Sequence, residues 1–199
     1  MALTVPPPPR SPRACGVARW YEHELGWAVS HGSGQPVQLV TGLRFDVLEL
    51  PATAGRAVLR RAGAGVGPVA LMGRRMRLLV AAGSAEELPG LLDWLEWGGI
   101  ALDLAALGAG GRMTAPVPPG WGGPGAPGAA VWLRAPEPGR EVESSLPALQ
   151  AAARGGAGAP CLVRLVAAAA AECHRVRLLS AATGEPAAQQ LAPQRFASS

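Results

Sequence analysis

Between residues 36 and 136, short β-like runs alternate with helix-like segments, and glycine or proline turns separate them. Short apolar or alternating runs bounded by such turns are typical of strands, whereas apolar residues three or four apart are typical of helices. This alternation restricts the chain to architectures that pack helices on a sheet. It predicts an α+β fold, a two-layer α/β arrangement in which a mixed β-sheet is flanked by helices. The expected strands cover residues 27–30, 36–42, 43–51, 67–73, 76–82, 98–104 and 129–136, with a short one within 108–120.

Three helices are expected in and before this region. Ser11 can cap a helix that continues to about Leu25, and a short helix covers residues 53–61. Ser84 can cap a third helix over 85–97, whose first turn carries two glutamates that favour the helix dipole. The expected buried stripe of the third helix is Leu88, Leu91, Leu92 and Leu95.

The chain divides into four expected regions. Residues 1–12 form a proline-rich leader and residues 184–199 a tail, and both are expected to be disordered. Residues 13–136 form the α+β domain. Residues 137–183 form a mainly helical C-terminal extension. The helices expected in this extension cover residues 145–154 and 161–182.

The amino-acid composition of this chain reflects the codon bias of its genome more than it reflects the fold. The 27 glycines and 20 prolines would otherwise argue for disorder, but all basic residues are arginine, and lysine and asparagine are absent. This bias toward GC-rich codons indicates a GC-rich bacterial genome. The net charge of +4 is compatible with a nucleic acid or another anionic partner without requiring one.

Cysteine content and hydropathy bear on the cellular compartment. Cys15, Cys161 and Cys173 lie far apart and show no spacing typical of a metal site. The N-terminus lacks the apolar core of a signal peptide, and the apolar run over 161–171 is too short to span a membrane. The sequence therefore predicts a cytoplasmic protein with reduced thiols and no membrane partner.

Four segments occur in the order found in a known domain family. They are LGWAV (25–29), TGLRFDVLELP (41–51), GRRMRLLV (73–80) and GIALDLAALGAGGRMTAPVPPG (99–120). Together they resemble the bifunctional primase–polymerase N-terminal domain of actinobacteria, phages and plasmids, which belongs to the archaeo-eukaryotic primase superfamily. The resemblance extends over residues 18–136, and the last segment is the most specific because its Asp, Gly-Gly and Ala-Pro keep their spacing.

The resemblance implies a nucleotidyltransferase site whose catalytic residues are degenerate. Such a site holds divalent metal with two or three carboxylates around a triphosphate. The first aspartate of the family's strand-end pair falls at Glu49, and the second falls at Pro51, which offers no ligand. The family's histidine falls at Met76. Only Asp103 matches the third carboxylate.

Strand geometry makes a relocated metal site difficult to build. Asp46 and Glu49 are three residues apart, so in a strand their side chains point to opposite faces. We therefore expect no catalytic activity and no resident cofactor, with Mg²⁺ or Mn²⁺ bound only if the domain is active. The alternative is an active primase/polymerase-type enzyme with a relocated metal site that uses Asp46, Glu49 and Asp103.

Arginines near the degenerate site are the candidate binding residues. Arg74, Arg75 and Arg77 surround Met76, and the arginines expected on the same side are Arg44, Arg60, Arg61 and Arg112. An arginine-lined cleft could bind a nucleotide, DNA or an acidic protein, and the competing interpretation is a solvated hairpin with scattered arginines. The expected function is a regulatory protein that binds nucleic acid or a partner. The further alternative is a pure protein-interaction module.

The aromatic residues offer a second kind of candidate surface. Trp94 and Trp97 are three residues apart, which favours core packing, with a partner-binding ridge as the alternative. Trp132 is expected in the core, whereas Trp121 lies in a Gly/Pro loop that is hard to bury.

Overall fold

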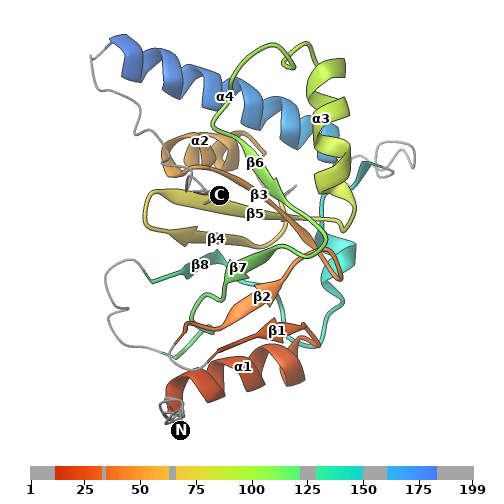
Figure 1. The fold of residues 1–199 in the computed structure, drawn as a ribbon, viewed down its shortest axis with the longest axis vertical. Coiled ribbons are helices and arrows are strands. Elements are labelled where there is room, and N and C mark those ends of the chain that lie inside the picture. The colour runs from red at the N-terminus through yellow and green to blue at the C-terminus, as the bar shows by residue number, and fades with distance from the viewer. Residues whose placement is uncertain (1–11, 33–34, 63–65, 122–128, 150–160, 183–199) are drawn as a thin grey trace, which may run out of the picture.

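A computed structural model of the chain describes residues 12–32, 35–62, 66–121, 129–149 and 161–182 (Figure 1). Its helices are α1 (Pro12–Glu24), α2 (Ala52–Ala62), α3 (Ser84–Trp94) and α4 (Leu162–Ala182), with a 3₁₀ turn at Val142–Ser145. Its strands are β1 (Val29–Ser30), β2 (Gln38–Val40), β3 (Asp46–Pro51), β4 (Val69–Met72), β5 (Arg75–Val80), β6 (Ala105–Leu107), β7 (Arg112–Thr114) and β8 (Val131–Arg134).

The strands form two sheets. A five-stranded sheet has the order β6-β3-β5-β4-β8, and a three-stranded sheet has the order β1-β2-β7. The expected α+β class and two-layer arrangement are confirmed. The expected mixed pairing is not observed, because every pairing of these eight strands is antiparallel. The hairpin expected between the two β-like runs is present as β4 and β5, with Gly73 at a φ of 56° in its turn.

Helices cover one face of the five-stranded sheet. Strand residues alternate in direction, so every second residue of β3 and β5 faces the helices. Figure 1 shows α2, α3 and α4 together above this sheet. Fully buried side chains such as Leu50 and Leu78 each contribute about 1.5–3 kcal/mol by leaving water. The core on this side includes Leu48, Leu50, Met76, Leu78 and Val80 from the sheet and Leu88, Leu91, Leu162, Leu165 and Val166 from α3 and α4.

The three-stranded sheet and α1 lie on the other side of the large sheet. A second core there combines Val47, Ala70 and Leu79 of the large sheet with Leu39 and Met113 of the small one. Its aromatic members are Tyr21, Trp27, Phe45 and the partly buried Trp132.

Tyr21 joins separate parts of this second core. Its hydroxyl donates to the Pro116 carbonyl at 2.8 Å and accepts from the Trp132 indole nitrogen at 2.8 Å. Burial raises the pKa of Tyr21 well above its ordinary value, although the Trp132 hydrogen bond opposes the rise. The phenol therefore stays protonated and holds the end of β8 to α1.

The C-terminal helix belongs to the main core. The buried residues Leu162, Leu165, Val166 and Ala169 of α4 pack with α2 and the sheet. The segment that the sequence suggested as an extension is thus integrated with the α+β domain. The helix expected over 145–154 is not seen in its described part, where a 3₁₀ turn ends at Ser145, and residues 150–154 lie outside the described residues. The expected leader and tail lie almost wholly outside them too.

Three local expectations near α3 are wrong for identifiable reasons. The helix ends at Trp94 rather than at residue 97, because Glu96 adopts a left-handed conformation with a φ of 64°. The Ser84 side chain does not cap the helix. Instead, the Ala85 amide in the first turn donates a hydrogen bond to Asp46 Oδ2 at 2.9 Å.

The strand expected over 98–104 is absent, and β6 begins at Ala105. Backbone carbonyls of this segment accept hydrogen bonds from side chains of α4 and not from a neighbouring strand. The Ala101 carbonyl accepts from the Arg177 guanidinium, and the Asp103 carbonyl accepts from the Cys173 thiol. The segment therefore lies along α4 and joins the sheet only afterwards.

Candidate functional site

Charged side chains lie at one end of the five-stranded sheet, and buried apolar side chains lie at the other end. On the face opposite the helices, Val47 pairs with Leu79, and two residues later Glu49 pairs with Arg77. Because strand side chains alternate with a period of two, Glu49, Arg75 and Arg77 share this face with the apolar pair. The face thus changes from buried apolar residues to ionised ones within one strand.

Glu49, Arg75, Arg77 and Asp103 form what we call the arginine–carboxylate cluster. Both Glu49 oxygens are occupied, since Oε1 accepts from Arg75 Nε at 3.1 Å and Oε2 from Arg77 Nε at 2.7 Å. Arg75 Nη1 donates to Asp103 Oδ1 at 2.6 Å, so its guanidinium bridges the two carboxylates. Arg77 also contacts the sulfur of Met72 at 3.5 Å.

The cluster is balanced in charge and partly shielded from water. The exposed fractions are 26% for Arg75, 20% for Glu49 and 13% for Arg77, against 57% for Asp103. Burial lowers the pKa of Arg75, but the hydrogen bonds and charges of Asp103 and Glu49 reverse this and raise it overall. Arg75 is therefore a permanent cation between two carboxylates.

Asp103 is held in place from behind by α4. The Cys173 thiol lies 3.5 Å from the Asp103 carbonyl oxygen. Burial raises the pKa of this thiol to about 12, and the negative charge of Asp103 adds to the rise. A thiol with such a pKa is almost wholly protonated at neutral pH, and the buried Cys173 side chain packs in the core on the helix side.

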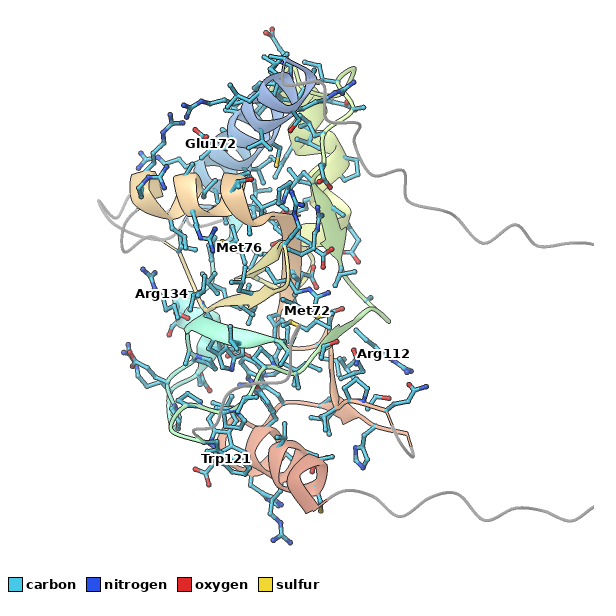
Figure 2. All side chains as sticks on the ribbon, turned by 90° about the vertical axis from the view of Figure 1, so that its left-hand side faces the viewer. Met72, Met76, Arg112, Trp121, Arg134 and Glu172 are labelled. Carbon is cyan, nitrogen blue, oxygen red and sulfur yellow. The ribbon has the colours of Figure 1, made fainter. Side chains whose placement is uncertain are left out.

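Met76, which sequence analysis aligned with the histidine of the resembled family, does not reach the cluster. Its side chain points to the helix side and is fully buried, as Figure 2 shows beneath α2. It packs where α2 has Gly55, at which a Cβ atom would come within 2.3 Å of the Met76 sulfur. The β5 residues on the cluster face are Arg75 and Arg77, one position to either side, because a shift of one residue reverses the face.

Asp46 is separated from the cluster by the sheet. It is fully buried on the helix side, where it accepts from the Ala85 amide, whereas Glu49 faces the other way. Desolvation raises the pKa of Asp46, although the Ala85 hydrogen bond opposes the rise. The structure thus separates Asp46 from Glu49 and Asp103, as strand geometry requires.

The other two candidate arginines, Arg74 and Arg112, are not members of the cluster. Arg74 is exposed in the β4–β5 turn, and its carbonyl accepts from the Ala52 amide at 2.7 Å. Arg112 is exposed at the start of β7, and Figure 2 shows it below Met72, at the right of the molecule. Neither forms an ion pair with any of the described residues.

The acidic groups of the cluster are poorly arranged for a divalent ion. A metal would have to displace the guanidinium that occupies Glu49 and Asp103, and arginine does not lose its charge in proteins. Among the described residues, no group of three or more His, Cys, Asp or Glu side chains is arranged to hold a metal ion.

A separate hollow of about 190 Å³ lies beside β8. Its polar groups already serve the fold: Arg134 donates to the Val66 carbonyl and Arg140 to Glu137. The remaining lining residues include Gly67, Pro68, Pro136, Ser144 and Ser145. The cluster, which carries more unusual chemistry, lies instead on β3, β5 and the segment that precedes β6.

One tryptophan, Trp94, differs from the sequence expectation. Trp94 is 71% exposed, so the expectation of core packing is wrong for it. Trp97 is partly buried and contacts the His174 ring at 5.6 Å between centroids. Trp121 is 39% exposed, with its ring against Gly16 of α1.

Comparisons of the chain with protein-family models, with curated proteins and with solved structures gave no match. Within the described residues, no helix combines the length and apolar character needed to cross a membrane.

Sequence reasoning missed the partners of the candidate arginines. The carboxylates of Glu49 and Asp103 were considered as metal ligands and the arginines as anion ligands, but the two sets bind each other. An alternating pattern was available as a signal, since Arg75 and Arg77 flank Met76 in the same period as Glu49 and Pro51.

Proposed function

We propose that this chain is a catalytically inactive primase–polymerase-like domain that acts in the cytoplasm as a nucleic-acid-binding regulatory protein. The single observation that carries the proposal is the Arg75 guanidinium between Glu49 and Asp103. These are the two positions where the resemblance puts metal-binding carboxylates. A fixed monovalent cation there supplies the positive charge that the carboxylates require, but it has no open coordination site for a triphosphate or a water.

Nucleic acid is the favoured partner because the candidate arginines outside the cluster carry unpaired positive charge. Arg75 and Arg77 are neutralised by Glu49 and Asp103, whereas the exposed Arg74 and Arg112 form no ion pair in the described part of the chain. Guanidinium groups bind phosphate oxygens in bidentate geometry, which suits a nucleic-acid backbone.

Primer extension tests the inactive state. The chain is incubated with a primed template, labelled deoxynucleotides and either Mg²⁺ or Mn²⁺, next to an active DNA polymerase as positive control. We expect no incorporation above that of a heat-treated sample. Incorporation that disappears in Asp103→Ala would support the relocated-site enzyme and contradict the proposal.

Anisotropy of a fluorescein-labelled DNA strand tests the binding. The apparent affinity should fall steeply as salt is raised, because binding releases counterions from phosphates. The variant Arg74→Gln/Arg112→Gln should lower both the affinity and the salt dependence, with the salt slope reduced by about 2. If the wild-type chain does not bind DNA but does bind a protein, the interaction-module alternative is favoured.

A further inference from the structure

A second group of arginines lies on the helix layer, away from the cluster. We use the name α2–α4 basic face for Arg56, Arg60, Arg61 and Arg175. All four side chains are exposed. Glu172 of α4 ties the two helices together, since it pairs with Arg61 and, at 3.6 Å, with Arg175.

The α2–α4 basic face has too little negative charge to be balanced. Glu172 is the only acidic residue of α4, and α2 has none. The Glu172 side chain is 3% exposed, whereas those of Arg61 and Arg175 are 59% and 62% exposed. The carboxylate is thus buried beneath guanidiniums that face solvent, and the surface that a partner meets is positive.

Helix geometry places the remaining two arginines side by side. Arg56 and Arg60 are four residues apart on α2, so their Cβ atoms are about 6 Å apart on the same side of the helix. Neither forms an ion pair with a described residue. Arg60 and Arg61 in the last turn also favour the helix dipole, but that effect does not account for Arg56 or Arg175.

The exposed side chains of α2 identify the kind of partner. They are Thr53, Arg56, Arg60 and Arg61, and none is apolar or aromatic. Insertion into a membrane surface requires an exposed apolar face, and protein interfaces depend on buried aromatic and aliphatic anchors. The exposed leucines of α4, Leu178 and Leu179, lie near its C-terminal end, and the part of the face on α2 carries charge from arginines alone. Such a surface fits a polyanion that is recognised by its backbone charge.

We infer that the α2–α4 basic face binds the phosphate backbone of DNA, independently of base sequence. This inference rests on the proposed nucleic-acid-binding function and adds a second contact surface to it. Figure 2 shows Glu172 beside α2 near the top of the molecule and Arg112 on the opposite side and much lower. Arg112 therefore lies apart from the α2–α4 basic face, whereas Arg74 adjoins the start of α2. Separate variants remove each pair of arginines without the other.

Anisotropy titrations of a short fluorescein-labelled DNA duplex with the full chain, at about 50 and 200 mM KCl, test the inference. The variant Arg56→Gln/Arg60→Gln removes two exposed arginines and keeps good helix formers. The matched control is Arg19→Gln/Arg140→Gln, which removes the same charge elsewhere on the surface. Circular dichroism and thermal unfolding confirm that each variant is folded.

We expect Arg56→Gln/Arg60→Gln to reduce the slope of log affinity against log salt by about 2, because each lost phosphate contact accounts for about 0.9. Between the two salt concentrations, the wild type should consequently lose about tenfold more affinity than this variant. The control variant should keep a salt slope close to that of the wild type.

Three results would overturn the inference. If Arg56→Gln/Arg60→Gln behaves as the control does while Arg74→Gln/Arg112→Gln loses affinity, the proposed function stands and the α2–α4 basic face is not part of it. If the wild type binds no DNA, both fail. If polyglutamate or anionic phosphatidylserine vesicles bind more tightly than DNA and lose affinity in Arg56→Gln/Arg60→Gln, the partner is of another class.

Discussion

The arginine–carboxylate cluster and the α2–α4 basic face use the same basic residue in opposite ways. In the cluster, two arginines meet two carboxylates, and at most about a quarter of either arginine is exposed. On the basic face, four arginines are exposed, and the one carboxylate, Glu172, is buried and pairs with only two of them. The comparison teaches that arginine content alone does not locate an anion site. The acidic residues that share the surface decide whether the charge is structural or available.

Removal of the carboxylate at the centre of the cluster should have the largest effect. Glu49→Gln leaves two poorly exposed guanidiniums facing each other without a counter-charge, and the free energy of unfolding should fall by about 2 kcal/mol. Urea unfolding at neutral pH measures this change.

The matched control for this variant is Glu137→Gln. It breaks an Arg140 pair in which both side chains are about two-thirds exposed, and the cost should stay below about 0.5 kcal/mol. Equal losses in the two variants would mean that the cluster is no more structural than an ordinary surface pair.

Glu172→Gln should have a smaller effect on stability and an opposite effect on binding. Arg61 and Arg175 remain well hydrated, so the free energy of unfolding should fall by only about 1 kcal/mol. DNA affinity should rise about twofold, because one negative charge leaves the basic face. Urea unfolding and duplex anisotropy measure the two quantities. An affinity that falls, or that rises in Glu49→Gln instead, would reverse the assignment of the two surfaces.

Asp46 extends the comparison of the two surfaces to a buried carboxylate that has no arginine partner among the described residues. We expect its replacement to have the smallest effect on the free energy of unfolding. Its pKa is raised in the folded state, so folding favours the protonated carboxyl. Its contribution is therefore fully present below the unfolded pKa of about 3.9 and is lost as the pH rises through the folded pKa.

Asp46→Asn tests this sign, since the amide oxygen can still accept from Ala85 without titrating. The free energy of unfolding of the wild type, relative to this variant, should decrease as the pH rises from about 3 to 7. Urea unfolding over a pH series measures it. A difference that increases with pH would mean that the carboxylate is stabilised by a cation in the native state.

Local sequence signals predicted the elements of this fold well. The periodic leucines of α3 pack into the core, and the alternating runs on both sides of Gly73 form a hairpin. Tertiary contacts overrode the sequence at residues 98–104, where α4 takes the carbonyls that a strand would use. No local pattern reports a donor that lies 70 residues farther along the chain.

The candidate site was predicted in part. Glu49, Arg75, Arg77 and Asp103 were each singled out, and strand period alone separated Asp46 from them. The sequence did not predict that the arginines and carboxylates of the cluster pair with each other, because ion pairs depend on strand register and not on composition. Arg60 and Arg61 were expected beside the hairpin arginines, whereas they lie on the helix layer. Their grouping with Arg175 was missed because Arg61 and Arg175 lie more than 100 residues apart, although the lack of acidic residues in α2 was a usable signal.

The integration of α4 into the core determines how this chain is made. Until α4 leaves the ribosome, the apolar face around Leu50, Met76 and Leu78 has no cover on its α4 side. Exposed sheet surface of this kind invites association with other unfinished chains. Packing of α4 onto this core is therefore the step that shields the sheet surface from such association.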